Sequence, residues 1–226
     1  MSAEACRAEI RSLGVARSWT WTRSYLVGDS DSRIGVLVDP ATTDGHERDL
    51  LRRRLLRGWS ICTIVLTHGH PDHISDASYW RAELDAPLAG NPADLPLFTS
   101  PSLNSSGAFG GEVATGGLDI ELVHGSILDA GRLRLEVIGL PGHSPGSIGL
   151  YFPGHLIGGD TLFAGSVGVD SIPGIGPLWG ASLETEIRSI RERIFTLPDS
   201  TVVHPGHGPD TTVGTEKATN PYASIR

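Results

Sequence analysis

Three histidines and an aspartate lie within six residues, in the string Thr-His-Gly-His-Pro-Asp-His at positions 67–73. Imidazole nitrogens and carboxylate oxygens are common ligands of zinc and of related divalent ions such as iron or manganese. His68 and His70 would point the same way if the preceding strand continued to its end, and Asp72 and His73 follow a turn marked by proline. Four such groups in one loop could serve two ions, one at each pair. A polar turn without a metal is disfavoured, because each buried imidazole would then need another hydrogen-bond partner.

Further candidate ligands follow later strand-like stretches, framed by Gly and Pro residues that let the backbone pass close by. The candidates are His143 in Pro-Gly-His-Ser-Pro-Gly, Asp160 in Gly-Asp-Thr-Leu-Phe and His207 in Pro-Gly-His-Gly-Pro. Asp39 ends another expected strand, where it could either support a ligand histidine or cap a turn. His124 belongs to no motif, and we expect it to be structural or exposed.

Strands and helices alternate in the hydrophobic pattern around these groups. The expected strands are residues 24–28, 34–39, 61–66, 86–89, 132–138, 148–152, 155–157 and 201–204, and the expected helices are 45–57, 74–84 and 182–194. Residues 3–13 are compatible with a strand or a helical turn. The order of the elements indicates an α/β protein.

Residues 91–130 break every period with repeated Gly and Pro. A connection of this length indicates either a lid or substrate-facing loop, or a tolerated insertion, and the sequence favours neither. Its apolar side chains, among them Leu95, Leu97 and Phe98, would suit a wall over a pocket. The apolar, glycine-containing residues 172–179 are also expected beside that pocket.

The chain has 226 residues, of which 39% are hydrophobic, 29 are Gly and 15 are Pro. This composition predicts a single domain over residues 1–226 with a sizeable core and many tight turns. A net charge of -8 disfavours binding to nucleic acid or to an anionic membrane surface, so a small-molecule substrate is the expected partner. Cys6 and Cys62 are the only cysteines, and no signal peptide or membrane span is evident, which favours a cytoplasmic protein, as a monomer or homodimer.

The four ligand motifs together resemble, in order, the metal-binding motifs of the metallo-β-lactamase superfamily. Within it, the sequence Gly-Asp-Thr-Leu-Phe-Ala-Gly-Ser and the segment Pro-Gly-His-Gly-Pro-Asp-Thr-Thr resemble single-domain type II glyoxalase-like (hydroxyacylglutathione hydrolase-like) hydrolases. The resemblance covers nearly the whole chain from Tyr25 onward. It implies the four-layer αββα sandwich, with the site where strand-end loops gather at one edge.

Two divalent ions are implied by this resemblance, most simply zinc, with iron or manganese as alternatives. One ion would be held by His68, His70 and His143, the other by Asp72, His73 and His207, with Asp160 bridging the two. Asp72 and Asp160 are also the expected catalytic carboxylates. A metal-bound hydroxide would then hydrolyse a thioester of the hydroxyacylglutathione type, or a related ester or lactone.

Two other functions stay open. The superfamily also supports a persulfide dioxygenase with one iron, which would be held here by His68, His143 and Asp160. A non-catalytic metal-binding domain is disfavoured because every expected ligand position is filled.

Three departures from the resemblance weaken the expectation of tight glutathione specificity. Arg23 replaces a usual asparagine, and the segment 169–171 lacks a usual arginine. Too few residues follow His207 for the C-terminal helical domain that helps two-domain glyoxalases grip glutathione.

Overall fold

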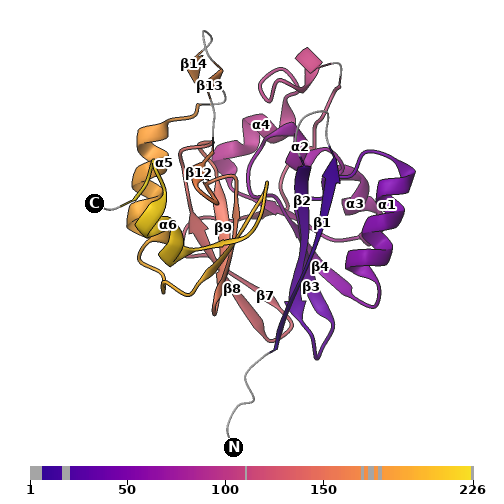
Figure 1. Cartoon of the computed structure of the whole chain (residues 1–226). Helices are drawn as coiled ribbons and strands as arrows, with labels where there is room; N and C mark the ends of the chain where they lie inside the picture. Colours follow the sequence, from indigo (N-terminus) through magenta and orange to yellow (C-terminus); the bar gives the residue numbers. More distant parts are fainter. Residues whose placement is uncertain are drawn as a thin grey trace, which may run out of the picture.

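Two six-stranded sheets face each other, and helices cover the outer face of each in this computed structural model (Figure 1). The structure describes residues 7–16, 21–109, 111–168, 171–172, 176–177 and 180–224. The four layers confirm the predicted αββα sandwich.

The first sheet has the order β1-β2-β3-β4-β5-β6. Its strands are β1 (Ala8–Ala16), β2 (Trp21–Asp29), β3 (Ile34–Val38), β4 (Ser60–Val65), β5 (Leu88–Gly90) and β6 (Ile120–Glu121). Strand β2 is antiparallel to β1 and β3, whereas β3 to β6 run parallel. The start of β2 therefore lies at the same edge as the ends of β3 and β4. Of residues 3–13, those from 8 onward belong to strand β1, and residues 3–6 lie outside the described chain.

The second sheet has the order β16-β15-β10-β9-β8-β7. Its strands are β7 (Ile127–Ala130), β8 (Leu133–Gly139), β9 (Ile148–Phe152), β10 (His155–Gly159), β15 (Val202–Pro205) and β16 (Thr211–Thr212). Strand β9 is antiparallel to both β8 and β10, and β15 is parallel to β10. The carboxyl ends of β8, β10 and β15 consequently share one edge. Two short hairpins lie outside the sheets: β11 (Leu162–Phe163) with β12 (Ser166–Val167), and β13 (Ser171–Ile172) with β14 (Gly176–Pro177).

Helices α1 (Gly45–Leu51) and α3 (Ala77–Leu84) cover the first sheet, and α5 (Leu183–Ser189) and α6 (Val213–Thr219) cover the second (Figure 1). Helices α1 and α5 each continue into a π-helical turn, Arg52–Leu56 and Ile190–Ile194. The predicted helix over 74–84 is confirmed over 77–84 as α3, but its predicted start was wrong, because residue 74 ends a separate short helix, α2 (Pro71–Ile74). Asp76 leaves the helical conformation between them, and its carboxylate accepts hydrogen bonds of 2.8 and 2.6 Å from the Arg48 guanidinium of α1.

Three apolar cores fill the spaces between the four layers. Consecutive strand residues point into different cores, since side chains alternate along a strand. Leu26 and Leu37 pack toward Trp80 beneath the helices, whereas Val27 and Val36 pack between the sheets. Burying each such leucine contributes about 1.5–3 kcal/mol, so the sandwich gives the strand ends a rigid base.

The segment 91–130 is more ordered than its sequence indicates. It contains short 3₁₀ turns at Pro92–Asp94 and Ser106–Phe109, the helix α4 (Leu95–Thr99), and strands β6 and β7. Phe98 is fully buried in the core under the first sheet, so it is not part of a pocket wall. Much of the segment 172–179, expected beside the pocket, lies outside the described residues. None of the helices in the described part of the chain has the length and hydrophobicity needed to span a bilayer.

Candidate metal centre

Four loops carrying the expected ligands leave the carboxyl ends of β4, β8, β10 and β15. The residues after β4 provide His68 to His73, and the other loops each provide one group. Strands β8, β10 and β15 end at a common edge of the second sheet, and β4 ends at the facing edge of the first sheet. The loops of both sheets therefore meet there. All seven expected ligands lie in this one cluster.

His68, His70 and His143 form the first ligand set. One ring nitrogen of each lies within 4.8 Å of the others, and their ring centroids are 4.3–4.7 Å apart. None of the three is more than 5% exposed. This set is therefore deeply enclosed and combines a loop of the first sheet with a loop of the second.

Asp72, His73 and His207 form the second ligand set. Their ligand atoms also lie within 4.8 Å of one another, and His207 Nε2 is 3.3 Å from both His73 Nε2 and Asp72 Oδ2. The side chains of Asp72 and His207 are 30% and 21% exposed. The second set is therefore the part of the cluster that faces solvent.

Asp160 lies between the two sets. Its Oδ2 is 3.0 Å from His207 Nε2 and 3.7 Å from His143 Nε2, and its Oδ1 is 3.4 Å from His73 Nε2. A carboxylate in this position can contact an ion at either set.

Asp39 supports the ligand histidines. Its Oδ2 accepts a 2.9 Å hydrogen bond from His73 Nδ1 and a 2.6 Å bond from the Thr67 hydroxyl. Since the Thr67 hydroxyl donates to Asp39, it accepts from His68 Nδ1, which lies 3.0 Å away. Both histidines thus carry their proton on Nδ1. Of the two roles that the sequence leaves open for Asp39, the structure favours support of ligands.

The start of β2 holds the second set. The Thr22 hydroxyl donates a 2.8 Å hydrogen bond to Asp72 Oδ2, and His207 Nδ1 donates a 3.1 Å bond to the Trp21 carbonyl oxygen. Sequence reasoning missed Thr22, because nothing in its neighbourhood indicates a contact 50 residues further along the chain.

The two sets differ in electrostatics. Burial and the neighbouring imidazoles hold the pKa of His68 well below its usual value, and burial lowers the pKa of His143 to about 4. Burial also lowers the pKa of His207, but the charge of Asp160 and hydrogen bonds to Asp160 and Asp72 outweigh it and raise that pKa to about 10. The first set therefore offers neutral imidazoles, whereas the carboxylates at the second set favour a protonated His207, whose Nε2 must lose its proton before it can bind an ion.

The donor atoms fit divalent transition ions. His68 Nε2 and His143 Nε2 are buried and have no hydrogen-bond partner among the described residues. A buried polar atom without a partner is costly, and a metal ion would supply the missing partner of both nitrogens. Two sets of three nitrogen or oxygen donors, with a carboxylate between them, match the ligand preferences of zinc, iron and manganese.

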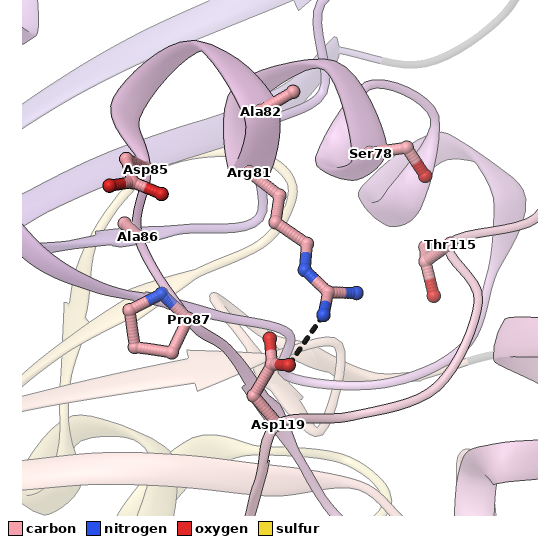
Figure 2. A pocket seen from close by; sticks show the side chains of 8 residues that line it. All are labelled: Ser78, Arg81, Ala82, Asp85, Ala86, Pro87, Thr115 and Asp119. Atoms are coloured by element: carbon pink, nitrogen blue, oxygen red, sulfur yellow. Dashed lines mark hydrogen bonds and ion pairs between the residues drawn. The ribbon is translucent and has the colours of Figure 1, made fainter.

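The remaining candidate histidine, His124, and the surface hollow beside α3 both lie outside the metal centre. His124 is exposed, as expected. A surface hollow of about 640 Å³ lies between α3 and the segment before β6. There Arg81 extends toward Asp119 and forms an ion pair with it (Figure 2). This hollow is distinct from the metal centre.

Known proteins resemble the chain over most of its length. The model of the metallo-beta-lactamase superfamily matches residues 22–207. The probable metallo-hydrolase YqgX of Bacillus subtilis is 37% identical, over 88% of this chain and 90% of the relative. The hydroxyacylglutathione hydrolase GloC of Haemophilus influenzae is 30% identical, over 87% and 90%. The mitochondrial persulfide dioxygenase ETHE1 of Mus musculus is 29% identical, over 99% and 79%.

Two solved structures share the fold. The B3 metallo-beta-lactamase BLEG-1 superposes with a TM-score of 0.84 at 28% identity, covering 96% of this chain and 100% of that chain. The protein TTHA1623, in a di-iron-bound form, gives a TM-score of 0.74 at 34% identity, covering 93% and 99%.

Proposed function

Because the chain belongs to the metallo-beta-lactamase superfamily, we propose that it is a hydrolase that uses two divalent metal ions to cleave a thioester, or a related ester or lactone. The observation that carries this proposal is the pair of three-donor sets, with Asp160 in contact with both. A single-ion site would leave one complete set without a role.

We assign His68, His70 and His143 to one ion, Asp72, His73 and His207 to the other, and Asp160 to both. When bound, such ions supply Lewis acidity, which activates water and polarises a carbonyl group. Hydrogen bonds within the protein orient the ligand histidines for these ions. Thr67, Asp39 and the Trp21 carbonyl hold the protons of His68, His73 and His207 on Nδ1, so that Nε2 of each is the donor atom. Zinc is the first candidate, with iron or manganese as alternatives.

Substrate would approach from the second set. Asp72 and His207 are partly exposed, whereas His68, His70 and His143 are almost completely buried. If both ions are held here, Asp72 and Asp160 would contact them directly, which supports these two residues as the catalytic carboxylates. The likeness to a hydroxyacylglutathione hydrolase supports a small thioester as the substrate class.

A persulfide dioxygenase is the second candidate, because the likeness to the murine enzyme of that name extends over 99% of this chain. In that case one iron would be held by His68, His143 and Asp160. The complete second ligand set argues against it, since a mononuclear site needs no second group of three donors.

The experiment is a substrate panel on zinc-, iron- and manganese-loaded protein. We expect hydrolysis of at least one thioester, ester or lactone, and loss of both activity and bound metal in Asp160→Ala, which removes the shared ligand. His124→Ala, an exposed histidine outside the centre, should retain wild-type values. Oxygen uptake with a persulfide and no hydrolysis of any ester would overturn the proposal in favour of the dioxygenase.

A further inference from the structure

Asp94 is a completely buried aspartate outside the ligand set. It ends the 3₁₀ turn Pro92–Asp94 and immediately precedes α4, within the segment that the sequence marks as irregular. Buried carboxylates need several hydrogen-bond donors, and the identity of these donors indicates what the residue does.

Within the described residues, three groups donate to the Asp94 carboxylate, and all three come from metal-binding loops. Its Oδ2 accepts from the Gly69 backbone N–H at 2.8 Å and from the Ser144 hydroxyl at 2.6 Å. Its Oδ1 accepts from the Gly146 backbone N–H at 2.7 Å. Gly69 lies between His68 and His70, and Ser144 follows His143. One carboxylate therefore joins the two loops that supply the whole first ligand set.

The glycines of both loops allow this close approach. A Cβ on Gly146 would lie 2.6 Å from the Asp94 backbone nitrogen, and a Cβ on Gly69 would lie 2.3 Å from Leu97 Cβ. Real Cβ atoms do not come this close to other atoms, so any larger residue would push the loops away from the 94–97 segment. The glycines at positions 69 and 146 thus allow residues 94–97 to pack directly against the metal-binding loops.

We infer that Asp94 is a positioning residue that fixes the spacing between the His68–His70 loop and His143, and thereby sets the metal affinity of the first ligand set. The inference rests on the proposed two-ion site. The two loops belong to different sheets, so their relative position depends on contacts that cross between them. Burial raises the pKa of Asp94, but the hydrogen bonds from Ser144, Gly146 and Gly69 act to lower it, because they favour the ionised carboxylate.

The second ligand set has other supports. Asp72, His73 and His207 are held by Thr22, by Asp39 and by the Trp21 carbonyl. Loss of the Asp94 carboxylate should therefore affect one ion more than the other, which distinguishes positioning from general destabilisation.

The test is a chelator titration with elemental analysis of the metal retained by the folded protein. In Asp94→Asn the amide presents a donor where the carboxylate had an acceptor, so it cannot accept all three bonds. We expect this variant to release one of its two ions at roughly 10–100-fold lower chelator concentration than the wild type, the usual cost of losing an outer partner of a metal ligand. Ser144→Ala removes one of the three bonds to Asp94, along with the contact between the Ser144 and Ser147 hydroxyls, and should shift the release in the same direction by less.

Two further variants identify the ion and control for burial. His207→Ala should weaken the second site. At a chelator concentration where His207→Ala and Asp94→Asn each retain one ion, the double variant should therefore retain neither. Asp29→Asn removes another fully buried carboxylate, which accepts from Ser32 and Arg132 at the far end of β2, roughly 26 Å from the site by strand length. It should release both ions as the wild type does.

The following results would overturn the positioning role of Asp94. Wild-type retention of both ions by Asp94→Asn, or equal weakening of both ions, would overturn the inference. If Asp94→Asn does not fold, Ser144→Ala decides, and unchanged release in that variant would refute the positioning role. A wild-type chain that binds fewer than two ions would contradict the proposed function, and the inference with it.

Discussion

For three of the five ligand histidines, the contact made by one ring nitrogen determines which nitrogen is available to a metal ion. His68, His73 and His207 donate through Nδ1 to a hydroxyl, a carboxylate and a backbone carbonyl respectively. In each case Nε2 is left to act as a ligand. Such partners fix both the tautomer and the orientation of the ring, so the geometry of the centre depends on residues that need not touch an ion.

At position 206 the metal centre leaves no room for a side chain, so glycine is required there. A Cβ at this position would lie 2.1 Å from Asp160 Oδ1 and 2.6 Å from His73 Cε1. We predict that Gly206→Ala displaces the shared carboxylate and lowers metal affinity and kcat/KM by roughly 10–100-fold, measured by metal analysis and kinetics.

Gly158→Ala is the matched control for this substitution. A Cβ on Gly158 would meet only Val203 Cγ1, at an ordinary contact distance of 3.5 Å. This variant should behave as the wild type. Full metal content and activity in Gly206→Ala would show that Asp160 does not occupy the position between the two sets.

Strands and turns connect the metal edge to the opposite edge of the sandwich. At that far edge, Asp29 at the end of β2 joins the two sheets by accepting hydrogen bonds from the Arg132 backbone N–H at 3.1 Å and from Arg132 Nε at 3.3 Å. Burial raises the pKa of Asp29, but these bonds and those from Asp31 and Ser32 outweigh it and hold the pKa well below its usual value. The ionised carboxylate is therefore favoured by folding.

The sign of the pH effect follows from this lowered pKa. A carboxyl group whose pKa is lower in the folded state stabilises the protein above its unfolded pKa of about 3.9, and this stabilisation is lost as the pH falls toward the folded pKa. We predict that Asp29→Asn lowers the free energy of unfolding of the metal-free protein by a constant amount from pH 7 to pH 5. The difference from wild type should shrink below about pH 4.

Urea denaturation across this pH range provides the measurement. Asp31→Asn is the control, because Asp31 forms an exposed ion pair with Arg132, and such pairs contribute about 0–1 kcal/mol. A difference between wild type and Asp29→Asn that stays constant to pH 2.5, or grows on acidification, would refute this account of the joint between the sheets.

Across the whole molecule, the sequence predicts the fold and the ligands better than it predicts their supports. The ligands lie in short motifs at strand ends, and the strands follow from period-two patterning, so both can be predicted locally. Thr22 and Asp94 cannot, because each acts on a residue 50 positions away and lies in no motif. The tertiary partner of Asp76, at the break between α2 and α3, could not be predicted either, because Arg48 lies on another helix.

The prediction that residues 1–226 form one domain remains a prediction. It is consistent with three cores that share two sheets, since each sheet contributes one face to the central core and the other to a helical layer.

The most direct test of the central claim is the number of metal ions bound per chain. The purified protein would be loaded separately with excess zinc, iron or manganese, freed of unbound metal by gel filtration, and measured by elemental analysis against protein concentration. The two complete ligand sets that share Asp160 predict two ions per chain with at least one of these metals. One ion per chain at saturation with every metal, or none, would contradict the account.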